Sequence, residues 1–181
     1  MATIRPLAPG DDRSAFRSGD PDLDRFFAKY AGQNQFRHHI GATYVAVDDA
    51  GALVGYATVS PGSIEIDAIP GALAKKLPRY PMPTLRLARL ASDERARGRG
   101  VGEALLRLVF ELALRLAEDY GCLAVVVDAK PGAVAFYEGF GFEPIDAVEG
   151  ASGSRPEPTL MWLSVAVIAA AGRRYRRGGS K

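Results

Sequence analysis

The stretch Arg97-Gly98-Arg99-Gly100-Val101-Gly102 joins an apolar, strand-like segment to the longest helical segment of the chain. Alternating glycines allow positive φ angles and let the backbone approach a ligand closely. The first turn of the following helix adds unpaired N–H groups and a partial positive charge. The stretch therefore predicts a site for a phosphate or pyrophosphate group, with Arg97 and Arg99 able to add side-chain contacts.

Two familiar phosphate-binding loops do not fit this stretch. No Gly-Lys-Ser or Gly-Lys-Thr follows it, which excludes a Walker A loop. The spacing is G-x-G-x-G, and no acidic residue closes a strand about 20 residues further on, which argues against a dinucleotide-binding fingerprint. Glycine spacing alone is also compatible with a flexible strand-to-helix connection.

The elements around the turn predict a single mixed α/β domain. Residues 100–120 carry an apolar stripe from Val101 to Leu116, typical of an amphipathic helix, and Gly121 is a plausible C-cap. Strands are expected on both sides of this helix, at residues 85–91 and 123–127, which makes the helix a parallel crossover. Further strands are predicted at residues 4–7, 43–47, 53–60, 64–68, 143–145 and 159–167, and helices at 22–37 and 133–138. Loops are predicted at 71–83, with room for one helical turn before Leu77, and at 150–158. The prediction is a largely antiparallel sheet flanked by helices.

Composition narrows the class of protein. The chain has 181 residues, 48% of them hydrophobic, which suits one ordinary globular domain. A single cysteine, Cys122, excludes an internal disulfide framework, and the adjacent His38 and His39 are too few for a zinc site, so no metal is expected. The apolar run at 160–171 is too short to span a bilayer, and the N-terminus lacks a secretory h-region. We expect a cytoplasmic protein.

Charge is concentrated at the C-terminal end. The formal net charge is +2, yet residues 173–181 contain five basic residues and no acidic one. The predicted organisation is a domain at residues 1–172 and a basic, flexible tail at 173–181 that can also touch nucleic acid.

At this point the sequence resembles the GNAT superfamily of acetyl-CoA-dependent N-acetyltransferases. Arg97-x-x-Gly100-x-Gly102 matches its (Q/R)-x-x-G-x-(G/A) signature, and the strand ending at Ser92 precedes it at the expected distance. The segment from Ala135 to Phe142, AFYEGFGF, looks like the closing motif of that family. The resemblance implies a sheet with a splayed parallel strand pair and acetyl-CoA as the acetyl donor.

A narrower resemblance links the chain to the acetyltransferase toxins of bacterial type II toxin–antitoxin pairs. The segments at residues 23–35, 55–63 and 78–83 carry it. Those toxins acetylate the α-amine of aminoacyl-tRNA and are held by a ribbon-helix-helix antitoxin. The resemblance thus implies aminoacyl-tRNA and such an antitoxin as partners, and a homodimer stays open.

The resemblance also assigns site residues. Tyr137 is the expected acid that protonates the leaving thiolate; a core aromatic is its alternative role. The backbone of the strand end is expected to pair with the pantetheine arm and the turn to hold the pyrophosphate, and these cofactor-binding residues are Leu90, Ala91, Ser92, Arg97, Gly98, Arg99, Gly100, Val101 and Gly102.

The acceptor side is less sharply defined. If tRNA is the acceptor, Arg79, Arg86 and Arg89 are candidate substrate-binding residues, and Arg25, Lys29 and Arg37 are candidates for phosphate contact, with a solvated face as the alternative. Glu65, Asp67 and Asp93 are possible bases, although the more common role of such residues is that of an ordinary surface carboxylate.

The alternatives for function are an acetyltransferase for a small amine or a protein N-terminus, and a non-catalytic acyl-CoA-binding module.

Overall fold

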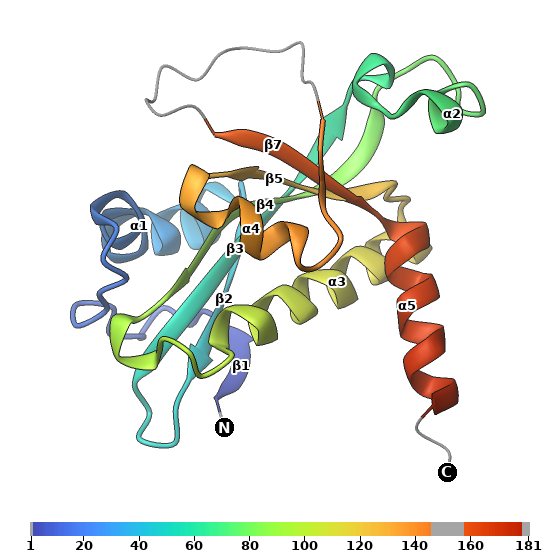
Figure 1. Cartoon of the computed structure of the whole chain (residues 1–181). Helices are drawn as coiled ribbons and strands as arrows, with labels where there is room; N and C mark the ends of the chain where they lie inside the picture. Colours follow the sequence, from blue (N-terminus) through green and yellow to red (C-terminus); the bar gives the residue numbers. More distant parts are fainter. Residues whose placement is uncertain (1, 146–157, 179–181) are drawn as a thin grey trace. The chain divides into compact units, whose positions relative to one another are not determined.

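The structure is a computed structural model that describes residues 2–145 and 158–178, with side chains up to residue 173 (Figure 1). Within these residues, seven strands form one sheet in the order β1-β2-β3-β4-β5-β7-β6. The strands are β1 (Thr3–Pro6), β2 (Ala42–Val47), β3 (Leu53–Ile64), β4 (Met82–Ser92), β5 (Ala124–Ala129), β6 (Glu143–Pro144) and β7 (Thr159–Ser164).

Helical elements fill the connections between the strands. The α-helices are α1 (Pro21–Arg25), α2 (Gly71–Ala74), α3 (Val101–Asp119), α4 (Val134–Glu138) and α5 (Val165–Gly178). Two π-helical segments, η1 (Phe26–Tyr30) and η2 (Gln33–His38), follow α1. Short 3₁₀ turns are η3 (Ile66–Ala68), η4 (Glu94–Ala96) and η5 (Pro131–Ala133).

The sheet confirms the predicted fold class. Strands β1 to β3 pair antiparallel, as do β5 with β7 and β7 with β6. Strands β4 and β5 are parallel neighbours, joined by the α3 crossover that the sequence predicts. The chain divides into two compact units, with residues 1–60 and 87–109 in unit 1 and residues 61–86 and 110–181 in unit 2.

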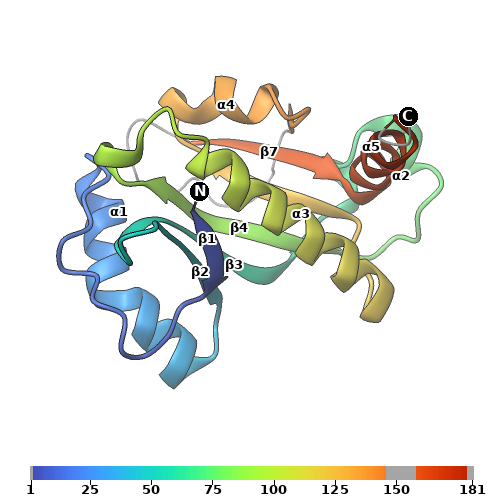
Figure 2. The same ribbon diagram turned by 90° about the horizontal axis from the view of Figure 1, so that it is seen from below.

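The core of unit 1 is built on both faces of β3. On one face, the Tyr56 ring stacks on Phe27 with centroids 4.3 Å apart, and its hydroxyl donates to Leu23 O at 2.8 Å. On the other face, Gly55 makes room for α3, since a Cβ there would lie 2.5 Å from Val101 Cγ1. Alternation along the strand thus places the α1–η2 stretch and the start of α3 on opposite faces (Figure 2).

The core of unit 2 has two parts. Ile64, Met82, Val126 and Trp162 belong to one buried cluster of strand residues. An aromatic group joins the second half of α3 to α4 and the residues after it, where Phe110 contacts Phe140 and Phe142 at centroid distances of 6.4 and 6.1 Å. Gly121 ends α3 with φ 99°, and its N–H donates to Leu116 O, which confirms the predicted C-cap.

Several boundaries differ from the sequence prediction; β4, for example, begins at Met82, inside the loop predicted at 71–83. The expected strand at 64–68 is wrong, because β3 continues to Ile64 and a 3₁₀ turn follows it. The strand expected at 159–167 ends at Ser164, where α5 begins, and the helix expected at 22–37 contains two π-helical segments. The predicted loop at 150–158 lies almost wholly outside the described residues, and α5 runs through the proposed boundary at residue 172.

No helix among the described residues has the length and apolar composition needed to cross a membrane.

Candidate functional site

The glycine turn adopts the conformation that its sequence requires. Gly98 and Gly100 both have φ 74°, a left-handed region that disfavours side chains. A Cβ at either position would meet nothing within 4 Å, so the space beside them is open. Ala104 is the first residue of α3 whose N–H reaches back to a turn carbonyl, that of Gly100, at 2.9 Å. The N–H groups before it start the helix without intrahelical partners, and these features together fit a diphosphate.

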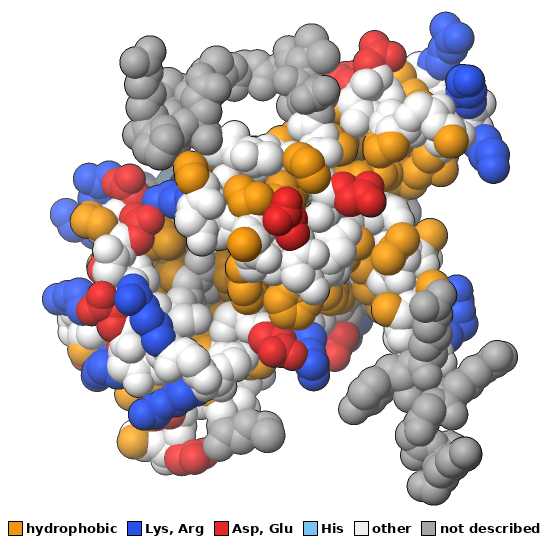
Figure 3. Space-filling view, viewed as in Figure 1, with side chains coloured by type: hydrophobic (Ala, Val, Ile, Leu, Met, Phe, Trp, Pro, Cys, Tyr) orange, Lys and Arg blue, Asp and Glu red, His pale blue; other side chains and the backbone are white. Residues whose placement is uncertain are grey.

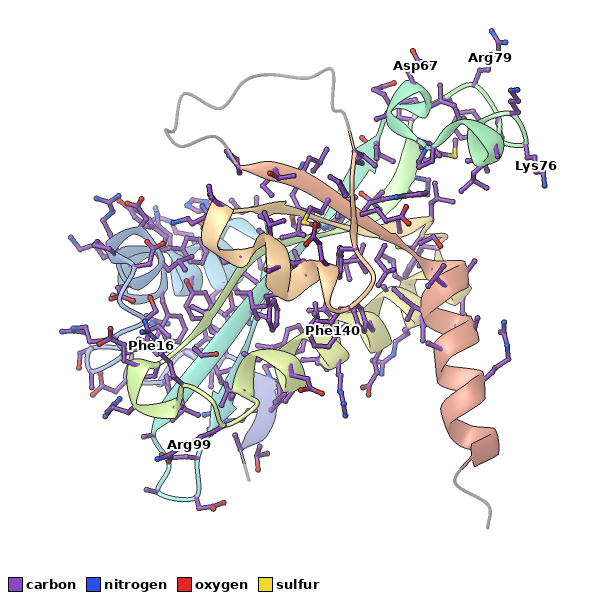
Figure 4. All side chains as sticks on the ribbon, viewed as in Figure 1. Phe16, Asp67, Lys76, Arg79, Arg99 and Phe140 are labelled. Carbon is purple, nitrogen blue, oxygen red and sulfur yellow. The ribbon has the colours of Figure 1, made fainter. Side chains whose placement is uncertain are left out.

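Arg97 and Arg99 use their side chains differently. The guanidinium of Arg97 donates to Ser18 O at 2.8 Å and lies 3.5 Å from Glu94 Oε1. The exposed Arg99 side chain makes no hydrogen bond or ion pair among the described residues and extends from the turn before α3 (Figure 4). Of these two residues, Arg99 is therefore the one whose guanidinium can meet a phosphate without losing a contact.

Asp93, between β4 and the turn, is a buried anchor. Its carboxylate is 0% exposed and accepts from Arg95 Nε at 2.7 Å, from Arg95 Nη2 at 2.9 Å and from the Arg17 N–H at 3.0 Å. These hydrogen bonds lower the pKa of Asp93 to about 2, the Arg95 side chain being the main cause. A carboxylate so occupied is a poor proton acceptor, so the suggestion that Asp93 serves as the base is not supported.

The end of β4 supplies the backbone expected to meet the pantetheine arm. Ala91 is 6% exposed, and Leu90 and Ser92 are half-buried. The next residue, Asp93, donates its N–H to Val54 O at 2.9 Å, which holds this end of the strand beside β3.

Tyr137 lies on α4 with its ring packed and its hydroxyl free. The ring is 5% exposed and meets Phe136 and Phe142 edge-on, with centroids 5.2 and 5.4 Å away. Among the described residues, the buried side-chain polar atoms without partners are Arg13 Nε and Thr84 Oγ1. The Tyr137 hydroxyl is not one of these atoms and makes no hydrogen bond within the described part of the chain, so it keeps some access to solvent. Burial raises the pKa of this phenol well above its ordinary value, which keeps it protonated and able to donate.

The three arginines predicted for substrate have different surroundings. Arg86 forms an ion pair with Asp128 of β5. The guanidinium of Arg89 lies 5.0 Å from the centre of the Phe26 ring, a cation–π arrangement. Arg79 is exposed after α2, in a region where Lys and Arg side chains gather (Figure 3, upper right), and points outward (Figure 4).

The remaining candidate bases and ligands do not converge. Glu65 and Asp67 are exposed, and Asp67, within η3, points outward (Figure 4). No three His, Cys, Asp or Glu side chains in the described part of the chain gather as a metal site would require.

The predicted residues are divided between the two units. Unit 1 brings together the β4 end, the turn at residues 97–102 and Arg89. Arg79, Arg86 and Tyr137 belong to unit 2. Sequence reasoning missed Ser18, Gly19 and Asp24, whose contacts support the turn. The Ser-Gly-Asp-Pro run at residues 18–21 was the available signal, since such runs mark tight turns and helix caps.

Comparison with known proteins identifies what these features resemble. Residues 39–144 match the family described as an acetyltransferase (GNAT) domain. A "tRNA-acetylating toxin" of Mycobacterium tuberculosis (strain ATCC 25618 / H37Rv) is 34% identical over 140 residues, which cover 77% of this chain and 82% of the toxin.

Solved structures agree on the fold. A tyrosine-to-phenylalanine mutant of KacT superposes with a TM-score of 0.82 at 25% identity, covering 94% of this chain and 98% of KacT. AtaT, in complex with acetyl-methionyl-tRNAfMet, gives a TM-score of 0.83 at 22% identity, covering 94% of this chain and 99% of AtaT. The second likeness concerns the fold alone.

Proposed function

The chain belongs to the acetyltransferase (GNAT) family, and from this we propose that it moves an acetyl group from acetyl-CoA to the α-amine of aminoacyl-tRNA. In this proposal the protein is the toxin of a toxin–antitoxin pair and blocks translation. The main support for aminoacyl-tRNA as the acceptor is the 34% identity to a tRNA-acetylating toxin across most of both chains. Residues 1–172 would form the acetyltransferase domain and residues 173–181 a basic extension.

The turn at residues 97–102 is the proposed binding site for the diphosphate of acetyl-CoA. Its support is the pair of glycines at φ 74°, the open space beside them and the unpaired N–H groups at the start of α3. Arg99 adds a free positive charge. The main chain of Leu90, Ala91 and Ser92 would pair with the amides of the pantetheine arm as an added strand does.

Acetyl-CoA supplies an acetyl group activated as a thioester. The acceptor amine forms a C–N bond to the acetyl carbon, the C–S bond breaks, and the amine loses one proton to water. In our proposal a backbone N–H near Leu90 stabilises the negative charge that develops on the acetyl oxygen. The Tyr137 hydroxyl gives its proton to the departing sulfur and regains one from solvent.

An α-amine acceptor suits a site without a clear base. A free α-amine has a pKa near 8, and esterification of its carboxyl lowers that further, so much of it is neutral at pH 7. A lysine side chain, near 10.4, would need a base to remove its proton. None of Glu65, Asp67 and Asp93 has the surroundings of one, which favours the α-amine.

The proposed partners follow from the toxin assignment. A ribbon-helix-helix antitoxin would hold the protein inactive, and a homodimer is compatible with this. Co-expression with the neighbouring small open reading frame tests the antitoxin: rescue of growth supports it, and continued growth arrest counts against it.

The decisive assay for the acceptor uses labelled acetyl-CoA. The protein is incubated with charged tRNA, with the same tRNA deacylated, and with a panel of polyamines and peptides. Label that enters only charged tRNA, and is released with the amino acid by mild base, supports the proposal. If the label enters a polyamine or a peptide N-terminus instead, that molecule and not tRNA is the acceptor.

A further inference from the structure

The helical stretch after α1 presents an exposed stripe formed by Lys29, Gln33 and Arg37, two of which are candidates for phosphate contact from the sequence. These residues recur at steps of four and are all exposed. The opposite stripe, Phe27, Ala31 and Gln35, faces the protein. Phe27 and Ala31 are buried, and the Gln35 amide accepts from the Thr43 N–H at 2.7 Å. Two residues along a helix turn the side chain by roughly half a circle, so the first stripe points to solvent.

The stripe carries positive charge that nothing in the described structure neutralises. Arg25, the third basic residue of this region, is paired with Asp22 at 2.6 Å. Lys29 and Arg37 have no ion pair or hydrogen bond within the described residues. The sequence from Phe26 to Val47 also contains no Asp or Glu. The result is a local positive surface on unit 1 with two available cations.

Aromatic and amide groups lie beside these cations. Tyr30 is 47% exposed and Phe36 is 40% exposed, more than large aromatic rings usually are. The Gln33 amide lies 3.1 Å from the His38 ring. Cations mixed with exposed rings and an amide are the groups that proteins use to hold a phosphate backbone and stack unpaired bases.

We propose that the stripe at Lys29, Gln33 and Arg37 is a second contact surface for the RNA body of the substrate. This rests on the proposed function and adds to it a place where the tRNA backbone is held. Eight residues of helix separate the two cations by on the order of 10 Å. Neighbouring phosphates of one RNA strand lie closer together than this, so the two cations would reach different phosphates. Tyr30 and Phe36 would meet exposed bases.

The test pairs a double charge reversal with a matched control. Lys29→Glu/Arg37→Glu changes the stripe, and Arg107→Glu/Arg115→Glu makes the same change of charge on the exposed side of α3. Each is assayed with whole charged tRNA and with an aminoacyl-adenosine, which keeps the reactive amine but lacks phosphates. The stripe variant should lose about 10-fold or more in kcat/KM for charged tRNA and keep the wild-type value for aminoacyl-adenosine. For charged tRNA, the logarithm of kcat/KM should fall less steeply with the logarithm of the salt concentration in the stripe variant than in the wild type. The difference in slope should correspond to the loss of about two phosphate contacts.

Three results would overturn the inference. The first is a stripe variant that matches the α3 variant on charged tRNA at every salt concentration. The second is an equal loss on aminoacyl-adenosine, which would place the effect at the reacting centre. The third is unchanged tRNA kinetics with lost inhibition by the antitoxin, which would assign the surface to a protein partner.

Binding of deacylated tRNA separates this proposal from the proposed function. If the wild-type protein acetylates neither charged tRNA nor aminoacyl-adenosine, the proposed function is wrong. The further inference still predicts that the stripe variant binds deacylated tRNA more weakly than the α3 variant does. Equal binding by the two variants would then reject the stripe.

Discussion

The guanidinium of Arg97 donates a hydrogen bond to the carbonyl oxygen of Ser18, 2.8 Å away, although 79 residues separate them. Ser18 is itself fixed, because its N–H and its hydroxyl both reach Asp24 Oδ1, at 2.8 and 2.6 Å. A second link runs from the Glu94 N–H to Arg17 O at 2.8 Å. The first residue of the glycine signature thus ties the proposed diphosphate turn to the beginning of α1.

Arg97→Ala should destabilise the protein modestly. The side chain is 64% exposed, so its contacts are screened and the lost hydrogen bond is worth about 1 kcal/mol. Arg97→Lys should restore part of this, since an ammonium can still donate to Ser18 O. Thermal unfolding measures both. The control is Arg107→Ala, which removes only an exposed pair with Glu103; equal effects of the two alanine variants would refute a special role for Arg97.

Gly19→Ala should be more damaging and should not add to Arg97→Ala. Gly19 has φ 87°, and a Cβ there would lie 2.6 Å from Glu94 Oε1 and 2.8 Å from Arg97 Nη2. Backbone strain of about 1–2 kcal/mol therefore combines with displacement of the Arg97 side chain. A double-mutant cycle followed by denaturant unfolding measures the coupling. Strict additivity would mean that Gly19 and Arg97 act independently.

Asp93 should make stability depend on acid pH. Its folded pKa of about 2 lies below the unfolded value, so its contribution is present above about pH 4 and is lost as pH falls toward 2. The contribution is on the order of 2 kcal/mol, from about two pKa units. Asp93→Asn lacks the charge, so the gap in unfolding free energy between wild type and variant should narrow over that range. A constant gap would contradict this assignment.

Tyr137→Phe should reduce kcat by roughly 10²-fold or more while acetyl-CoA still binds. The ring packs against Phe136 and Phe142, contacts that phenylalanine keeps, so the fold should survive. Single-turnover acetyl transfer and calorimetric binding of acetyl-CoA measure the two effects separately. Full turnover by the variant would remove the acid role from Tyr137.

Local patterns predicted the part of the fold that surrounds the turn. The apolar stripe predicted a helix at residues 100–120, and the observed α3 runs from Val101 to Asp119. The agreement is close because the repeat of apolar residues along a long amphipathic helix is unambiguous. The short helix before Gly139 and the helical turn at Gly71–Ala74 also agree with prediction. The break at Ser164 was missed, since the apolar run from Leu160 continues smoothly from strand into helix.

Contacts between distant segments could not be predicted. Asp93 looked like a surface carboxylate, yet the Arg17 N–H, far away in sequence, helps to bury it. In the sequence, Arg86 and Arg89 looked equally free of partners. In the structure, Arg86 forms an ion pair with Asp128, and Arg89 lies over the Phe26 ring. Such pairings depend on which segments the sheet brings together, and local spacing carries no information about that.

The most direct test of the account is the affinity of the turn for coenzyme A. Calorimetry should show binding of acetyl-CoA to the wild-type protein and at least about 10-fold weaker binding to Gly100→Asp, because a carboxylate at that turn opposes the diphosphate. Gly51→Asp is the matched control, because Gly51 also has a positive φ, 82°, and open space beside it; this variant should bind acetyl-CoA as the wild type does. Equal affinities for all three proteins, or no heat from the wild type, would contradict the central claim.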